Sequence, residues 1–515
     1  MSVFDEPSRR NRLGLHFIDP EKAAPVINAL FDVVHAARMK VATKGYGKQE
    51  PEVRNHIEQV VVDLYAMWYA DPTLYIGYSR GDENFKGDGC YAGKLNGKIF
   101  KDIIDSLAAA GYIENHIQDA GQKDKSSRMR GTPKLAALIE DELLSWASIS
   151  TNPSEGVLIL KSEKPKKPKK GSRKEVLFKD SDDLRIPAMR ENLEAINKKL
   201  EETLINIFVT DDQQADINNR LRKDPDRLAL DFTQRKLHRS FVNNSWDEGG
   251  RFYGGWWQGV PSEYRQYIQI EGKQTVEWDY SSIHPSILYI NAGLPRPIDA
   301  YDIPDWDKQY RGLIKKAFNQ LINSSKTTKP MTQWFKLAPD VNPDPLPAGW
   351  DKMKGGKKAP IRRKAFKKLT GRDYNDLLTD IIKHHKPIYN VFFAQVWGRL
   401  QKLDSNIAEE VMIDLYEQGI VVLPIHDSFI VRKGFEGYLK TAMNIAFQKH
   451  LDAIPGLKSD TQDISLDDWL LDIKNDRVLS GSDMVSIIKD GIGEYIRFET
   501  RQSQWRAAQG LSGWD

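Results

Sequence analysis

The chain has very little cysteine and no long apolar run. Cys90 is the single cysteine among 515 residues, which excludes an internal disulfide and a zinc site built from several cysteines. We expect Cys90 to be a small, half-buried residue. No apolar run approaches the length of a membrane-spanning helix, and residues 1–10 lack the apolar core of a secretory signal. The sequence therefore predicts a cytoplasmic protein that does not bind membranes.

The chain also has almost no net charge. Its 75 basic and 72 acidic residues leave a net charge of +3, so overall charge argues little for a nucleic-acid partner. Local clusters of basic residues are more informative. Hydrophobic residues make up 40% and charged residues 29%, as in ordinary globular proteins, and the length allows more than one core.

Composition predicts four parts along the chain. Lysine and proline dominate residues 161–174, and such a stretch cannot bury a core, so we expect an extended, solvated linker there. The predicted parts are a mostly helical unit at 1–160, the linker at 161–177, a second folded unit at 178–475, and a C-terminal helix (484–496) with a polar tail at 476–515. Within the second unit we expect an amphipathic helix at 185–206 and a loop or insertion at 340–363.

The first unit contains a helix followed by a basic hairpin. Residues 96–113 place apolar side chains on one helical face, and Gly111 ends the helix; these side chains are Ile99, Ile103, Leu107 and Ala110. A basic stretch follows, with Lys123, Lys125, Arg128 and Arg130. The pattern resembles a winged-helix module, whose recognition helix would enter the DNA major groove. A plain helical packing domain is the alternative.

Two aspartates follow apolar, β-branched stretches that predict buried strands. Asp279 lies in the segment 277–289, and Asp427 lies in the segment 420–431. Mg²⁺ prefers carboxylate oxygens, and carboxylates from neighbouring strands can bridge two such ions. A metal pair stabilises both the attacking and the leaving oxygen of an in-line phosphoryl displacement. We therefore expect both aspartates to hold two Mg²⁺ ions, or Mn²⁺ in their place.

Residues 249–431 resemble the palm and fingers of family A DNA polymerases and single-subunit RNA polymerases. The first aspartate motif also resembles that of family B DNA polymerases. The matching motifs occur in the same order along the chain, namely Gly250-Arg-Phe-Tyr253, Asp279-Tyr-Ser-Ser-Ile-His-Pro-Ser-Ile287, the segment 311–322 and Leu423-Pro-Ile-His-Asp-Ser-Phe429. The resemblance implies an α+β fold, a right-handed palm with an antiparallel sheet and helical fingers.

The resemblance also implies roles around the two aspartates. The Tyr280 carbonyl would be a second oxygen ligand beside Asp279. His284 falls where these families carry the side chain that discriminates the sugar, and histidine leaves the choice between dNTP and NTP open. The primer or template would be contacted by four residues, Arg251, Tyr253, Gln401 and His426.

Arg311 opens a predicted helix that resembles the nucleotide-binding fingers helix. Arg311, Lys315 and either Phe318 or Asn319 recur at steps of three and four residues along one face. The arginine and lysine would grip the triphosphate, and the lysine would protonate the pyrophosphate leaving group. Motif spacing leaves Lys315 and Lys316 as alternatives, and Lys315 is preferred because it shares the face of Arg311. A basic cluster at 354–368 is expected to contact phosphates.

The sequence thus predicts a template-directed nucleic-acid polymerase without proofreading, acting on a DNA template-primer with dNTP or NTP. The Gly-Arg and Asp-Tyr-Ser-x-Ile motifs favour a DNA polymerase, and His-Asp-Ser-Phe favours an RNA polymerase or primase. His284 and Ser428 depart from the families, which keeps open a catalytically inactive DNA-binding replication or regulatory protein. A nuclease using the same acids is a further alternative. By analogy, a phage or mobile element is a plausible source.

Overall fold

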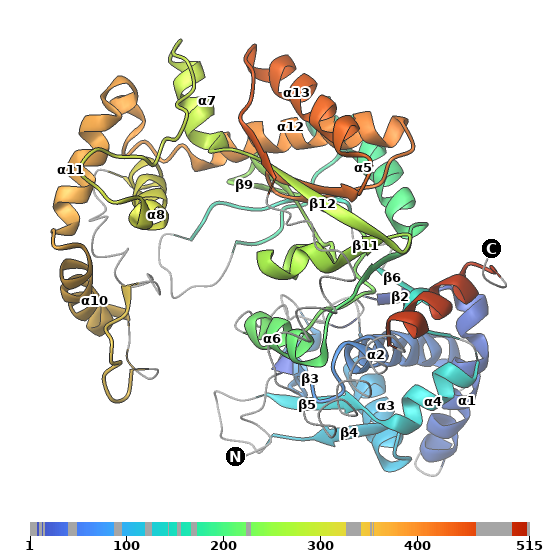
Figure 1. The fold of residues 1–515 in the computed structure, drawn as a ribbon. Coiled ribbons are helices and arrows are strands. Elements are labelled where there is room, and N and C mark those ends of the chain that lie inside the picture. The colour runs from blue at the N-terminus through green and yellow to red at the C-terminus, as the bar shows by residue number, and fades with distance from the viewer. Residues whose placement is uncertain are drawn as a thin grey trace, which may run out of the picture.

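The computed structural model describes residues 8–9, 13, 16–39, 49–86, 95–118, 126–142, 144–151, 156–165, 173–222, 228–325, 341–350, 353, 355–459 and 497–511. Cys90, Lys123, Lys125 and the helix predicted at 484–496 lie outside these ranges. The described residues form a mixed α+β fold with antiparallel sheets and two hydrophobic cores, as the predicted fold class requires at this level (Figure 1). None of the helices in these ranges is long and apolar enough to cross a membrane.

The N-terminal unit packs helices against a small sheet, drawn in blue and cyan in Figure 1. Its helices are α1 (Pro20–Met39), α2 (Glu50–Ala70), α3 (Gly97–Ala109) and α4 (Pro133–Asp141). Its sheet has the order β1 (Ser8–Arg9), β3 (Tyr75–Tyr78), β5 (Ser127–Gly131), β4 (Ile113–His116). A separate pair joins β2 (His16–Ile18) and β6 (Ile149–Thr151).

Helix α3 forms where the apolar spacing predicts it. Ile99, Ile103 and Leu107 are buried on its inner face. The Asn96 side chain accepts hydrogen bonds from the first-turn N–H groups of the helix, which a helix start otherwise leaves unsatisfied. Gly111 adopts a φ of +79°, which ends the helix. The hairpin β4–β5 follows, so the predicted order of helix and hairpin is present.

The second unit is built on a central antiparallel sheet. Its strands are β13 (Val422–Ile425), β14 (Ser428–Arg432), β12 (Lys273–Tyr280), β11 (Ile268–Ile270) and β8 (Ile205–Ile207) in spatial order, with β15 (Leu457–Ser459) paired to β12. A smaller sheet has the order β10 (Ser245–Tyr253), β9 (His238–Val242), β7 (Leu158–Leu160).

Helices of the second unit cover the sheet and extend to one side of it. Figure 1 shows α5, α12 and α13 over the sheets, α7 next to them, and α8, α10 and α11 as an arm to one side. Their bounds are α5 (Ile186–Glu201), α6 (Asp211–Leu221), α7 (Ile283–Asn291), α8 (Arg311–Asn323), α10 (Gly355–Thr370), α11 (Tyr374–His384), α12 (Trp397–Glu417) and α13 (Glu436–Leu451). The apolar face predicted for residues 185–206 is buried along α5.

The flanks of the lysine- and proline-rich run do not form the predicted extended linker. Lys161 and Glu175 form an antiparallel bridge, and the Val176 N–H donates to the Leu160 carbonyl at 2.8 Å. Trp146 already belongs to the second core. The chain therefore enters the second unit before the run, because β-branched and aromatic residues ahead of it pair and pack there.

Two other predictions of irregular chain are wrong. Residues 355–363, expected within a loop or insertion, form the first half of α10. Residues 497–508, expected as a polar tail, are helical. Arg501 in that helix donates to the Asn206 side chain at 2.7 Å and to the Ile207 carbonyl at 2.8 Å. Tertiary contacts with β8 thus fix a segment whose composition alone predicts no structure.

A buried ion-pair cluster joins the two units. His16 of β2 contacts the carboxylates of Asp63 on α2 and Asp231 of the second unit, the latter at 3.1 Å. Burial alone lowers the pKa of His16, but the two carboxylates outweigh burial and raise the pKa to about 9. Histidine at this junction is therefore protonated near neutral pH.

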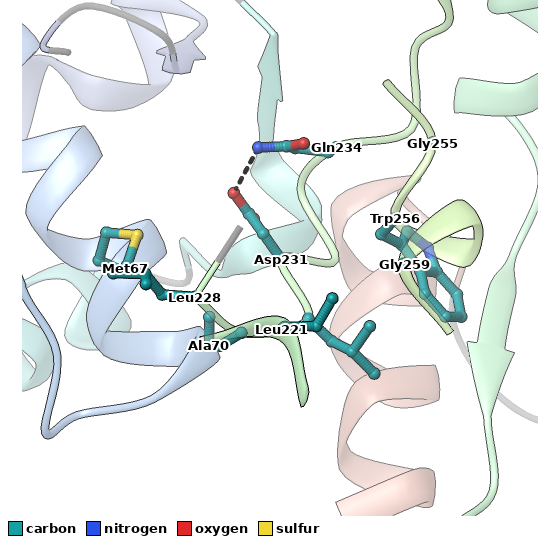
Figure 2. A pocket seen from close by; sticks show the side chains of 11 residues that line it. Met67, Ala70, Leu221, Leu228, Asp231, Gln234, Gly255, Trp256 and Gly259 are labelled. Atoms are coloured by element: carbon teal, nitrogen blue, oxygen red, sulfur yellow. Dashed lines mark hydrogen bonds between the residues drawn. The ribbon is translucent and has the colours of Figure 1, made fainter. Parts of the chain in front are cut away.

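A small cavity lies at the same junction. Figure 2 shows that it is lined by Met67 and Ala70 of α2 on one side, and by Asp231, Gln234 and Trp256 of the second unit on the other. Its volume is about 30 Å³, room for roughly two water molecules. A cavity of this size has no room for an organic ligand of nucleotide size.

Candidate active site

The two predicted aspartates meet at the end of one strand pair. Strand β12 pairs with β14 in a register that sets Asp279 opposite Ser428. The Tyr280 N–H then donates to the carbonyl of Asp427 at 3.2 Å. Opposed residues in such a pair have Cα atoms about 4.5–5.5 Å apart, so Asp427 is an immediate neighbour of Asp279. The backbones of the two predicted residues are therefore adjacent, and the sharing of metal ions by their carboxylates stays a prediction.

A tight turn presents Asp427 at the edge of the sheet. Ile425 pairs with Ser428 across the β13–β14 hairpin, so His426 and Asp427 alone form the loop. His426 has a φ of +61°, a left-handed conformation that is uncommon for residues other than glycine. Its ring contacts that of Tyr253 edge-on, with centroids 5.5 Å apart. Two residues predicted to contact primer or template are therefore adjacent to the aspartate pair.

The acids of this sheet differ in how they are engaged. Glu277 is buried, accepts from the Ser428 hydroxyl at 2.6 Å and pairs with Arg265 at 2.9 Å. Asp279 is half-buried, and the Lys458 ammonium of β15 lies 3.2 Å from its carboxylate. Glu277 is thus engaged by Ser428 and Arg265 in the interior, whereas Asp279 is paired with a half-exposed lysine at the surface.

Arg251 and His284 converge on a buried acid that the sequence analysis did not single out. Asp404 of α12 is 2% exposed, accepts from His284 Nε2 at 2.8 Å and pairs with the Arg251 guanidinium. Burial raises the pKa of Asp404, but the hydrogen bond from His284 and the charge of Arg251 outweigh it and hold the pKa below its usual value. The useful signal is helical spacing, since Asp404 lies three residues after Gln401 on the same face of α12.

The same cluster is coupled to the aspartate pair. Burial lowers the pKa of Arg251, but the carboxylate of Asp404 and, more weakly, that of Asp427 raise it above the ordinary value. Arg251 is therefore in the electrostatic field of the turn that carries Asp427. Its guanidinium is already paired with Asp404, which limits the surface it offers to a primer or template strand.

Tyr301 is a second residue that the sequence analysis missed. Burial raises the pKa of its hydroxyl, the charge of Arg311 opposes the rise, and that of Asp427 adds to it. Arg311 at the start of α8 lies over the Tyr301 ring, 5.1 Å from its centroid, and pairs with Asp299 at 2.7 Å. Arg311 is thus on the side of the arm that faces the aspartate pair. No spacing pattern in the sequence connects Tyr301 to this cluster.

Helix α8 does not present one continuous nucleotide-binding face. Arg311 and Lys315 are exposed, but Phe318 is fully buried against Tyr301, His385 and Phe392. The expected contact of Phe318 with a nucleotide is wrong, because α8 buries one face along its whole length and Phe318 lies on that face. Lys316 and Asn319 lie on another flank of α8, in a polar groove of about 970 Å³ that also includes Arg173 and Trp397.

The contacts and burial of Tyr280 and Gln401 bear on the roles predicted for these two residues. The Tyr280 side chain is buried and its hydroxyl donates to the Met443 carbonyl at 2.7 Å, so any ligand role must belong to its backbone carbonyl. Gln401 is half-buried in the second turn of α12, about one turn before Asp404. The predicted metal role of the Tyr280 carbonyl and the template role of Gln401 stay predictions.

The metal role predicted for Asp279 and Asp427 stays a prediction. Within the ranges that the structure describes, no group of three or more His, Cys, Asp or Glu side chains gathers as a metal site. Mg²⁺ is commonly held by one or two carboxylates, with water and substrate phosphates completing its octahedron. Two aspartates could serve in that way only together with such ligands, and Lys458 would have to leave the Asp279 carboxylate.

In the N-terminal unit, charged residues of α3 and of the β4–β5 hairpin are paired with other residues of the same unit. On α3, Asp105 pairs with Arg80 at 2.6 Å, and Lys101 pairs with Asp82 at 2.6 Å. In the hairpin, Arg130 pairs with Glu114 at 2.6 Å, and Arg128 is buried. Of the basic residues that predicted a DNA-binding wing, Arg128 and Arg130 are thus engaged within the unit, and Lys123 and Lys125 lie outside the described residues. The DNA-binding role of this unit stays a prediction.

Comparisons with known proteins found a distant structural likeness and no match at the level of sequence. No protein-family model matches the chain, and no curated protein sequence matches it. Among solved structures, the chain is similar to the POL domain of Pol1 from M. smegmatis, in complex with DNA primer-template and dNTP. That likeness has 16% identity and a TM-score of 0.25, and covers 47% of this chain and 49% of the other. The chain therefore spans about half the length of that structure, and a likeness this distant carries no argument about the site.

Proposed function

We propose that the protein is a template-directed nucleic-acid polymerase that uses Asp279 and Asp427 to hold two Mg²⁺ ions. The observation that supports the proposal is the pairing of β12 with β14, which sets the backbones of two aspartates that are far apart in the sequence next to each other. Two metal ions between them would activate the primer hydroxyl and stabilise the pyrophosphate leaving group. In terms of the family resemblance, the central sheet is the palm and the α8–α11 arm the fingers.

The surrounding cations support phosphoryl transfer. Arg311 and Lys315 are exposed at the start of α8, and Arg311 shares the electrostatic surroundings of Tyr301 with Asp427. In this proposal Arg311 exchanges Asp299 for the triphosphate, and Lys315 protonates pyrophosphate. His426 and Tyr253 would border the primer terminus.

A DNA polymerase is the preferred form, and an RNA polymerase or primase is the alternative. The hydrogen bond to Asp404 holds the His284 ring in place, where it would meet the sugar of the incoming nucleotide. A fixed ring can exclude a 2′-hydroxyl or bond to it, so the sugar preference must be measured. DNA template-primer and dNTP are the proposed substrates.

A nucleic-acid-binding protein without turnover is the second candidate. One observation favours it: the Lys458 ammonium occupies a position beside Asp279 that a metal ion would need. In that case primer-template would bind without incorporation.

Primer extension separates these candidates. Wild type is expected to extend a primer with dNTP faster than with NTP, in the presence of Mg²⁺. Asp427→Asn is expected to abolish extension, and Asp414→Asn on α12, outside the site, is the matched control. Binding of primer-template without incorporation of either nucleotide would support the second candidate, and degradation of DNA without nucleotide would support a nuclease.

A further inference from the structure

Helix α10 carries the strongest concentration of positive charge on a single described helix. Its sixteen residues include no acid. They include seven bases, Lys357, Lys358, Arg362, Arg363, Lys364, Lys367 and Lys368. Charge alone usually marks a solvated face, so the partners of each base decide what the helix can bind.

Four of these bases are engaged with neighbours. Lys358 and Arg362 lie over the Trp350 ring, 5.0 and 5.3 Å from its centroid. Arg363 and Lys367 share the carboxylate of Asp373 at 3.4 and 3.0 Å. These contacts attach α10 to the segments before and after it.

The other three form a row on the outer side of the helix. Lys357, Lys364 and Lys368 are exposed, and steps of seven and four residues align them on one face. Ala359 and Phe366, on the opposite face, are buried. The row is about 16 Å long at 1.5 Å per residue. Within the described ranges no ion pair or ring contact involves these three lysines.

We propose that Lys357, Lys364 and Lys368 bind the phosphate backbone of duplex nucleic acid. This surface lies beyond the active site and rests on the proposed function only for the identity of the polyanion. A duplex carries about one negative charge per 1.7 Å of its axis, so a 16 Å row faces roughly ten phosphates. Lysine ammonium groups that contact phosphates, and not base edges, bind the nucleic-acid backbone independently of its sequence.

The surroundings of α10 favour nucleic acid over a lipid surface. A membrane-bound amphipathic helix inserts an apolar face into the bilayer. The apolar side of α10 is already used, because Phe366 packs on the rings of Trp306 and Tyr374, with centroids 6.4 and 5.6 Å apart.

Helix α10 is also tied to the helix that opens with Arg311. The Tyr310 hydroxyl, one residue before α8, donates to the Leu369 carbonyl at the end of α10 with a distance of 2.7 Å. Figure 1 shows both helices in one arm beside the central sheet. A duplex bound by these three lysines would therefore contact a helix that is hydrogen-bonded to the start of α8, the helix proposed to bind the nucleotide.

The salt dependence of duplex binding tests this surface. The full chain and its Lys357→Gln/Lys364→Gln/Lys368→Gln variant are titrated with a labelled DNA duplex without nucleotide, over a range of NaCl concentrations. The slope of log affinity against log salt should become shallower by about 2–3 in the variant, since each lost phosphate contact contributes about 0.9. Lys22→Gln/Lys179→Gln/Lys198→Gln removes three exposed lysines elsewhere and should leave the slope unchanged.

The outcomes separate this inference from the proposed function. An Arg triple variant at the same positions should restore the slope, which shows that charge rather than folding is responsible. An unchanged slope in the Gln variant, or equal loss in the control, overturns the inference even if primer extension proceeds. Preferential binding of wild type to anionic vesicles over duplex also overturns it. A shallower slope in a protein that never extends a primer supports the surface and contradicts only the polymerase.

Discussion

The charged residues of α3 and those at the end of the β12–β14 pair are engaged differently. In the N-terminal unit, exposed charges such as Arg80 and Asp105 are paired with each other at the surface. In the second unit, Asp279 and Asp427 sit at a sheet end beside a buried cluster centred on Asp404. Charges that neutralise each other near solvent contribute little to function, whereas acids brought together by strand pairing can bind an ion. The second unit is therefore where chemistry is expected.

The largest expected effect comes from the aspartate pair. Asp279→Asn and Asp427→Asn should each lower the rate of nucleotide incorporation by on the order of 10³-fold or more, because each removes a carboxylate from the metal pair. Asp105→Asn in the N-terminal unit is the matched acid and should leave the rate within about two-fold. Single-turnover primer extension measures both. A loss of incorporation rate in Asp105→Asn as large as that in Asp279→Asn or Asp427→Asn would contradict this difference between the two regions.

The next effect concerns stability. Asp404→Ala should lower the free energy of unfolding by about 3 kcal/mol or more, because Arg251 and His284 lose a partner that is 2% exposed. The Asp105→Ala change removes an exposed partner and should cost no more than about 1 kcal/mol. Urea denaturation of the two variants provides the measurement, and equal costs would show that the Asp404 cluster is not buried as described.

A third effect depends on pH at the junction of the units. The folded pKa of His16, about 9, lies above its ordinary value of 6.5. The stability it adds is therefore present in full below pH 6.5 and is lost as pH rises through 9, with a total on the order of 3 kcal/mol. Thermal unfolding of wild type should show this decline between pH 6.5 and 9.5. His16→Gln should be less stable at pH 6 and should lack this part of the decline. A parallel pH profile in both proteins would contradict the assignment.

The smallest effect is expected on the outer face of α3. Lys98 is exposed there, and neighbouring charges on the helix are paired within the unit. Lys98→Gln should weaken duplex binding by less than about two-fold at 0.15 M salt. A loss of ten-fold or more would show that this helix recognises DNA, and the N-terminal unit would then share the nucleic-acid role.

The predictable parts of the fold have local signals. Period-3.6 apolar patterns predict α3 and α5, and β-branched runs around Asp279 and Asp427 predict β12 and the β13–β14 hairpin. Motif order then predicts that the two aspartates meet. The proline- and lysine-rich run at 161–174 misleads because its flanks pair with each other, and composition does not report pairing.

The rest of the site depends on tertiary contacts that no short pattern contains. Helical spacing from Gln401 puts Asp404 on the same face of α12, but its pairing with Arg251 depends on the packing of α12 on β10. Phe318 shares its spacing with Arg311 and Lys315, but packing of the arm buries it. Tyr301 lies in an irregular segment between α7 and α8, and its contacts with Phe318 and Arg311 follow from the fold of the whole unit.

The most direct test of the account is to locate Mn²⁺ in a crystal of the protein with primer-template and a non-hydrolysable nucleotide. The account predicts anomalous density between the Asp279 and Asp427 carboxylates, within about 2.0–2.5 Å of their oxygens, with Lys458 displaced from Asp279. Density confined to the nucleotide phosphates, with Lys458 still paired to Asp279, would contradict it.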